Sequence, residues 1–133
     1  MTTNYRVIEN EQEPILDCGP GSRSRVLAGA THGTKFMSVV ERWLDPGAEI
    51  VTHRHPEGVE EVIWVRSGQG EFWVDDERQT VGEDTTLVIP PLSTHGVRAV
   101  GDEPLYFMSR YSAARPVTVA DGGGEGEPEV PGS

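Results

Sequence analysis

The stretch "THRHPEGVEEVIW", residues 52–64, contains two of the chain's four histidines, one residue apart, followed by two adjacent glutamates. In a β-strand, residues i and i+2 point to the same face, so His53 and His55 are expected side by side with Arg54 turned away. The "EG" at 57–58 can return the chain, and the apolar run "VIWV" predicts a second strand. The stretch therefore predicts two strands that bring a carboxylate opposite an imidazole pair.

Only one of Glu60 and Glu61 can supply that carboxylate, because neighbouring residues of a strand point to opposite faces. The run into the apolar segment favours Glu61, and Glu60 remains the alternative. A third imidazole is expected from His95, at the start of "HGVRAV". Three imidazoles and one carboxylate are a ligand set for a divalent first-row transition metal, not for Ca²⁺ or Mg²⁺. On an octahedral ion they leave about two positions for water or a substrate.

The rest of the chain contains short runs of β-branched and aromatic residues, which are separated by Gly, Pro and Asp clusters. Turns are expected at 45–47, 67–70, 75–77, 82–84 and 101–104. A spacing of roughly 8–14 residues between such runs predicts an all-β sandwich or barrel, and a single barrel is the economical choice. The predicted strands are "KFMSVVERWL", "EEVIWVRS", "GEFWVDD", "TTLVIP", "HGVRAV" and "PLYFMSRYS".

Composition narrows the class of protein. The 133 residues suffice for one soluble globular domain, and 22 acidic against 11 basic side chains give a formal net charge of −11. Such a charge repels phosphate backbones and anionic lipids, so neither nucleic acid nor a membrane surface is an expected partner. The short basic run "RSR" at 23–25 is interpreted as a solvated turn. One cysteine, Cys18, and no secretory leader or membrane-spanning run favour a bacterial cytoplasmic location.

Two units are expected along the chain. Residues 1–117 are predicted to form the folded domain with an N-terminal arm. Residues 118–133, which include "DGGGEGEPEVPGS", contain little to bury and are predicted to be a disordered acidic tail of Gly, Glu and Pro.

The histidine stretch with its flanks resembles the first sequence motif of the cupin family, which reads G, five residues, H-x-H, three or four residues, E, six residues, G. This chain reads Gly47, "AEIVT", His53, Arg54, His55, "PEGVE", Glu61, "VIWVRS", Gly68. If Glu61 is the ligand, the loop before it is one residue longer than the motif. If Glu60 is the ligand, the loop has the expected length and the spacing to Gly68 is one residue too long.

The second cupin motif is G, five residues, P-x-G, two residues, H, three residues, N, and it is only partly kept. Gly82 is followed by "EDTTLVI", "PPL", "ST" and His95, so the spacing from proline to histidine is preserved. The preceding stretch is two residues longer, Leu92 replaces the glycine and Ala99 stands at the asparagine position. The resemblance spans residues 47–99 and keeps the metal-ligand position of this motif.

The resemblance implies an antiparallel double-sheet jelly-roll β-barrel, commonly a homodimer, with one divalent metal (Fe, Mn, Ni, Cu or Zn) bound by His53, His55, Glu61 and His95. With Glu61 facing the metal, alternation places Ile63, Val97 and Phe107 inside, as the apolar wall of a small-molecule pocket or simply as core. Outward Trp64 with Trp43 or Trp73 is a candidate dimer surface, or packs under the N-terminal arm. The remaining histidine, His32, is expected to be solvent-exposed, and a proton shuttle over the metal is the alternative.

For the reaction, the resemblance implies a metal-dependent enzyme that acts on a small oxygenated metabolite, aromatic or enolisable. A dioxygenase similar to quercetin dioxygenase is favoured because all four ligand positions are filled. The alternatives are a non-redox cyclase or isomerase similar to polyketide cyclases, and a non-catalytic ligand-binding cupin. The retained glutamate differs from the three-histidine thiol dioxygenases of the family, and the filled H-x-H pair differs from its metal-free sugar epimerases.

Overall fold

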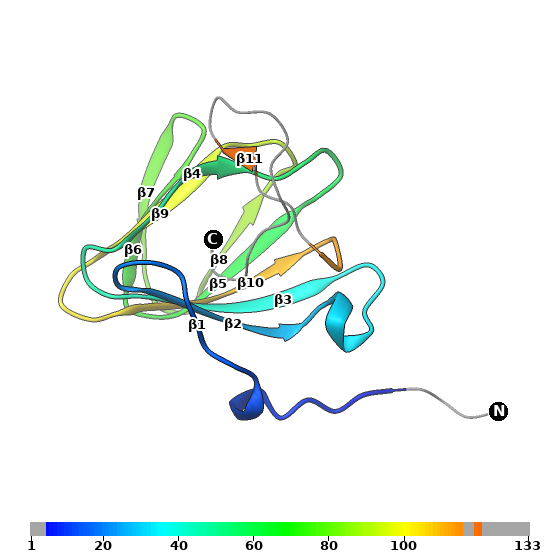
Figure 1. The fold of residues 1–133 in the computed structure, drawn as a ribbon. Coiled ribbons are helices and arrows are strands. Elements are labelled where there is room, and N and C mark those ends of the chain that lie inside the picture. Colours follow the sequence, from blue (N-terminus) through cyan, green and yellow to red (C-terminus); the bar gives the residue numbers. More distant parts are fainter. Residues whose placement is uncertain (1–4, 116–118, 121–133) are drawn as a thin grey trace.

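The computed structural model describes residues 5–115 and 119–120, which fold into two facing antiparallel sheets (Figure 1). One sheet has six strands in the order β1-β2-β3-β10-β5-β8, and the other has five in the order β11-β4-β9-β6-β7. The six-stranded sheet contains β1 (Leu16–Asp17), β2 (Ser22–Ala28), β3 (Ser38–Leu44), β5 (Glu61–Ser67), β8 (Thr85–Ile89) and β10 (Leu105–Tyr111). The five-stranded sheet contains β4 (Glu49–Arg54), β6 (Gln69–Val74), β7 (Glu77–Val81), β9 (His95–Val100) and β11 (Val119–Ala120).

The predicted jelly roll is confirmed as a double sheet. Within the described residues no strand of one sheet is hydrogen-bonded to a strand of the other, so the barrel is not closed by backbone pairing. Side chains between the two sheets hold them together instead. The core cluster combines residues of both sheets: Leu44, Ile63, Val65, Phe72, Val81, Ile89, Val97, Ala99, Leu105 and Phe107.

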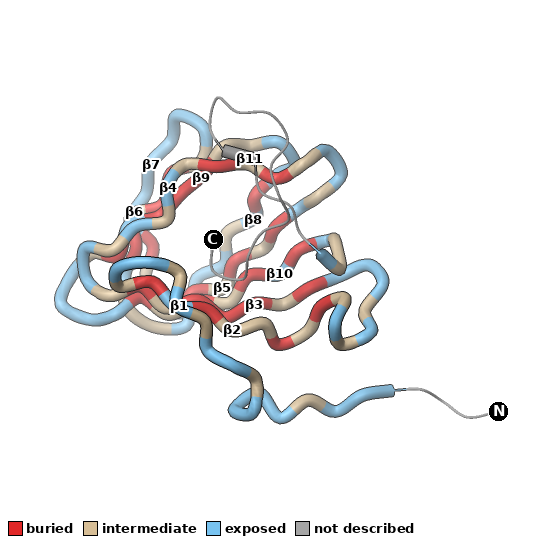
Figure 2. Tube along the Cα trace, in the orientation of Figure 1, coloured by how far each residue is buried: buried red, intermediate tan, exposed pale blue. Residues whose placement is uncertain are grey.

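Alternation along the strands explains this core. In β5 the residues Glu61, Ile63 and Val65 are buried while Val62 and Trp64 between them are only partly covered. The same rule places Val97 and Ala99 of β9 inside, as expected from the sequence. Figure 2 shows buried residues along both sheets and exposed ones in the arm and most loops.

The expected turns are present where strands reverse. Gly68, between β5 and β6, has φ +76°, and a Cβ built on it would lie 2.3 Å from the carbonyl oxygen of Pro104. A side chain therefore cannot be accommodated at this position without moving the neighbouring backbone. Gly47 and Gly101 also have positive φ, as do the non-glycine turn residues Asp75 and Asp84.

One predicted turn is wrong. The run "RSR" at 23–25 lies inside β2, where Ser24 is fully buried and Arg25 forms an ion pair with Glu41 of β3. The pairing of Arg25 with Glu41 across the two strands explains why a polar run can form a strand in the interior of the sheet. Polar composition alone had suggested a solvated turn.

The N-terminal arm runs away from the two sheets (Figure 1) and includes a short 3₁₀ helix, η1 (Asn10–Gln12). A second one, η2 (Ala30–His32), connects β2 to β3. Of the predicted acidic tail, only Val119 and Ala120 are among the described residues, and they pair with Arg54 and His53 of β4. No helix in the described ranges is long and apolar enough to cross a membrane.

The tryptophans are covered differently from the prediction. Trp73 is buried, with its indole N–H donated to Thr52 Oγ1 and the guanidinium of Arg78 over its ring, so it does not offer an exposed dimer surface. Trp43 stacks on Tyr106, at 5.3 Å between ring centroids. Trp64 donates its indole N–H to Asp84. The homodimer stays a prediction.

Candidate metal centre

Two strand ends of the five-stranded sheet bring the three clustered histidines together. His53 lies on β4 and His55 lies just beyond its end, so the i, i+2 relation puts both imidazoles on the inner side. Antiparallel pairing of β4 with β9 places His95 directly opposite His53. The ring centroids of His53 and His95 are 4.4 Å apart, and those of His53 and His55 are 5.2 Å apart.

The carboxylate comes from the other sheet. Glu61 is the first residue of β5 and is buried, whereas Glu60 is exposed and its backbone N–H donates to Ser112 Oγ. The chain reaches β5 through a turn in which Gly58 has φ +86°. Of the two glutamates, the structure places Glu61 beside the histidines and turns Glu60 to solvent.

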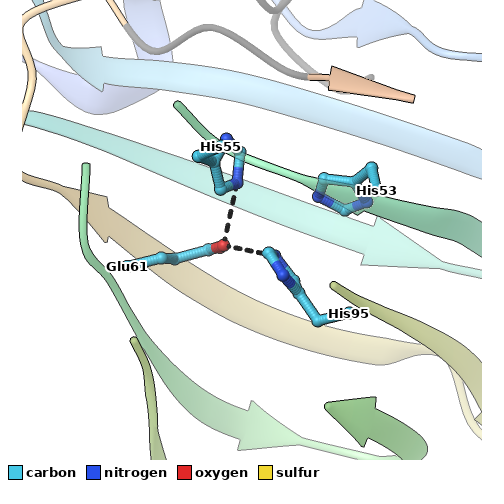
Figure 3. A group of neighbouring side chains, drawn as sticks. All are labelled: His53, His55, Glu61 and His95. Atoms are coloured by element: carbon cyan, nitrogen blue, oxygen red, sulfur yellow. Dashed lines mark hydrogen bonds and ion pairs between the residues drawn. The ribbon is translucent and has the colours of Figure 1, made fainter. Parts of the chain in front are cut away.

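The four side chains converge on one point between the sheets (Figure 3). Each has a ligand atom within 4.8 Å of those of the other three, and each residue is at most 8% exposed. Glu61 Oε1 accepts hydrogen bonds from His55 Nε2 at 3.2 Å and from His95 Nε2 at 2.9 Å. A carboxylate from one sheet and imidazoles from the other therefore meet in the interior.

Burial and neighbouring charges set the protonation of this cluster. Burial lowers the pKa of His53 to about 4, and the nearby His95 adds to the effect, so His53 is neutral at physiological pH. Burial by itself would raise the pKa of Glu61. Hydrogen bonds from His55 and His95 outweigh it and hold that pKa well below its usual range. The cluster thus offers an ionised carboxylate and at least one neutral imidazole.

The orientation of the rings fits a metal ligand set. His53 Nδ1 lies 2.8 Å from the carbonyl oxygen of Val51, and His95 Nδ1 lies 3.0 Å from that of Ser93. A carbonyl oxygen only accepts, so both Nδ1 atoms carry hydrogen. The Nε2 atom of neutral His53 is then available to a metal, whereas that of His95 becomes available only when a metal takes the place of the hydrogen donated to Glu61. Such imidazoles with a carboxylate suit a divalent transition ion, which His53, His55, Glu61 and His95 could hold together.

A narrow pocket adjoins the cluster and contains about 20 Å³ of free space, enough for roughly one water molecule. The three predicted wall residues Ile63, Val97 and Phe107 all line it, together with Phe72. Three polar residues also line the pocket: Ser109, which shares the inner face of β10 with Phe107 as the alternation predicts, and Arg42 and Tyr111, which were not predicted. The alternation of "SVVERWL", with Val40 and Leu44 inside, could have revealed Arg42 as an inward residue.

His32 lies apart from this group. It is neither a member of the cluster nor a wall residue of the pocket, and its side chain is only 9% exposed. Its Nε2 lies 2.9 Å from Glu13 Oε1, which ties η2 to the N-terminal arm. The expectation of a solvent-exposed histidine is therefore wrong, because the arm covers it.

Residues 42–111, which include all four clustered residues, match the family described as the Cupin domain. The chain belongs to the cupin family. Fold, sequence motifs and the position of the four ligand candidates agree with this membership.

Two relatives of this cupin are named after polyketide biosynthesis. Over 91 residues it is 33% identical to polyketide synthase CurC of Streptomyces cyaneus, covering 68% of this chain and 56% of CurC. The polyketide cyclase RemF of Streptomyces resistomycificus has a similar structure, with a TM-score of 0.73 at 19% identity over 88% of this chain and 85% of RemF. The chain spans just over half the length of the curated relatives it matches.

A third relative is an oxalate decarboxylase of Bacillus subtilis with Mn(II) centres. It shares 26% identity and a TM-score of 0.70, covering 83% of this chain and 30% of that enzyme. A cupin of comparable structure thus holds a divalent metal, and the buried cluster here has the residues to do the same.

Proposed function

We propose that this cupin is a divalent-metal-dependent enzyme that catalyses non-redox proton-transfer chemistry, such as cyclisation or isomerisation, on a small enolisable metabolite. The observation that carries the proposal is the convergence of three buried imidazoles and one buried carboxylate beside an apolar pocket. Three histidines and one glutamate leave about two positions on an octahedral ion for a substrate.

Different residues of the site would bind the metal, position a ligand and shape the pocket. His53, His55, His95 and Glu61 would hold the ion, which when bound acts as a Lewis acid that lowers the pKa of coordinated oxygens and favours an enolate. The ring of Tyr111 packs edge-on against His55, with centroids 5.0 Å apart, and holds that imidazole in position. Ile63 and Phe107 limit the pocket to about one water molecule, and the little water present strengthens charge interactions within it.

The choice of non-redox chemistry departs from the dioxygenase that the motifs favoured. Two of the relatives named above are a polyketide synthase and a polyketide cyclase, and their names support carbon-acid chemistry at this kind of site. A dioxygenase remains the second candidate, because the filled ligand set also suits a redox-active ion with positions left for O₂ and substrate.

The test is metal analysis followed by two assays on one preparation. Protein is loaded with Zn²⁺ or Mn²⁺, or with Fe²⁺ without air, and supplied with a panel of α-keto acids, β-keto acids and β-diketones. We expect one metal per chain and faster exchange of α-protons in D₂O, seen by NMR, with no O₂ consumption. Substrate-dependent O₂ uptake by the Fe²⁺ form would favour the dioxygenase. One bound metal with neither activity would support the ligand-binding alternative, and a metal-free protein would refute both enzymatic candidates.

A further inference from the structure

Arg42 places a fixed positive charge in the wall of the pocket. Its strand, β3, points Val40, Arg42 and Leu44 inward in alternation, and the Arg42 side chain is only 2% exposed. The same pocket is lined by His53 and Glu61 of the candidate metal centre. A guanidinium stays protonated even when buried, so this wall carries a permanent cation.

Ser109 is the second polar group of that wall. It is 1% exposed, and its Oγ has no hydrogen-bond partner among the described residues. Strand β10 pairs with β3 so that Phe107 lies opposite Arg42 and Ser109 opposite Val40. Ser109 is therefore the diagonal neighbour of Arg42 on the inner face, a separation that a long side chain can span. A buried hydroxyl without a partner is costly unless a ligand supplies one.

The charges around the pocket favour an anionic ligand. Among the described wall residues, Arg42 and Glu61 are the acidic or basic side chains other than the histidines. A divalent ion on the four ligands more than offsets the single negative charge of Glu61, and Arg42 adds to the excess of positive charge. In a pocket walled by Ile63, Phe72 and Phe107, that excess is poorly screened by water.

The shape of the site points to a carboxylate. A guanidinium binds a planar carboxylate through two parallel N–H···O bonds, and a serine hydroxyl can donate a third. The free space of about 20 Å³ corresponds to roughly one water molecule, so a carboxylate enters only if the side chains of the wall move, and the rest of the ligand stays outside. We propose that Arg42 and Ser109 form a carboxylate-binding subsite, so that the substrate is an enolisable carboxylic acid held at its acid group by Arg42. This inference rests on the function proposed above for the metal centre.

The experiment compares acetate with acetamide, two probes of similar size that differ in charge, by calorimetric titration of the Zn²⁺-loaded protein. We expect acetate to bind at least about 10-fold more tightly than acetamide, because a hydrogen bond to a charged group contributes more than a neutral one. Arg42→Met should weaken acetate binding by about 10-fold or more while one zinc per chain is retained. Ser109→Ala should weaken it by a few-fold without loss of thermal stability, since its Oγ has no partner to lose among the residues that the structure describes.

Two results would overturn the subsite: equal affinity of the wild type for acetate and acetamide, or unchanged acetate affinity in Arg42→Met that still holds zinc. If Arg42→Met does not fold, the acetate affinities of Arg42→Lys and Ser109→Ala test the subsite instead, because the lysine keeps the charge but loses the paired N–H donors. Unchanged affinity in both would refute the proposal. If the wild type binds no metal, the proposed function fails, and titration of the metal-free wild type and variants still determines whether acetate binding depends on Arg42.

Discussion

Two buried glutamates of the six-stranded sheet can be compared directly. Glu61 on β5 is 4% exposed and faces the other sheet, and Glu41 on β3 is 5% exposed. Glu41 alternates with the inward residues Val40 and Arg42 along β3, so it belongs with Trp43 to the opposite face. Both carboxylates are equally removed from water, yet only one of them belongs to a metal-competent cluster.

Their partners make the difference. Glu41 accepts hydrogen bonds from the Arg25 guanidinium, at 2.8 Å from Nε, and from the Tyr106 hydroxyl. Glu61 accepts from two imidazoles, His55 and His95. A guanidinium has no lone pair for a metal, whereas a neutral imidazole has one. Burial of a carboxylate therefore does not by itself mark a functional site, and the chemistry of its partners does.

The largest predicted effect is on the inner cluster, which consists of Glu61 with His53, His55 and His95. His95→Ala removes one of four ligands, and we expect the affinity for Zn²⁺ or Mn²⁺ to fall at least about 100-fold while the fold is kept, since even changes to groups around metal ligands cost 10–100-fold. Metal content after gel filtration and circular dichroism would measure both. Glu60→Ala is the control and should retain full metal content, because that side chain is exposed. Metal retention by His95→Ala with loss in Glu60→Ala would show that another ligand set is used.

A smaller effect is predicted for the outer cluster, which consists of Glu41 with Arg25 and Tyr106. Arg25→Ala leaves Glu41 buried without its cation and should lower the free energy of unfolding by about 2 kcal/mol, below the range for fully buried pairs because Arg25 is partly exposed. The matched control is Arg78→Ala. Arg78 likewise pairs with a glutamate, Glu71 at 3.2 Å, and lies over a tryptophan, but at the surface, so its loss should cost less than about 0.5 kcal/mol.

Urea unfolding of the metal-free proteins measures both changes, and metal binding by Arg25→Ala should equal that of the wild type. If Arg25→Ala instead abolished metal binding with little loss of stability, the two glutamates would not be independent, and the distinction drawn between their faces would be wrong.

The smallest effect is a pH dependence of the outer cluster. Burial, together with the hydrogen bond to Glu41 and its negative charge, raises the pKa of Tyr106 from 10.0 to about 12. Below pH 10 Tyr106 is protonated in both the folded and unfolded states. Between pH 10 and 12 the unfolded chain loses this proton first, so the free energy of unfolding should fall as the pH rises. Urea midpoints of the wild type and Tyr106→Phe would measure it, with a shallower decline expected in the variant. Parallel curves would contradict the assignment.

Much of the fold could be predicted from local pattern. The alternation in "EEVIWVRS" and "HGVRAV" identified β5 and β9 and the inward residues Ile63 and Val97, because side chains of a strand alternate between faces whatever surrounds them. The same reasoning selected Glu61 as the inward glutamate. The spacing of histidines and glutamate around a turn further identified the four residues that the structure brings together.

What failed depended on contacts between distant segments. The "RSR" run forms part of β2 because Glu41 lies opposite Arg25, and His32 is covered because Glu13 of the arm reaches it. Trp73 is buried where Gly96 of β9 leaves room for its ring: a Cβ on Gly96 would lie 2.4 Å from it. None of these partners is close in sequence, so no local pattern reports them.

By itself the sequence determined an all-β cupin chain, the strands that carry its core, and the three histidines and one glutamate that can hold a metal. The strands follow from periodicity within single segments, and the family and the ligand set follow from the resemblance to the two cupin motifs. Only the tertiary structure decided that Arg42 and Ser109 share a pocket with them, and that Glu41 is neutralised elsewhere. The physical reason is that pairing of β3 with β10 and stacking of the two sheets set which charges meet in the interior, and that register is a property of the assembled fold.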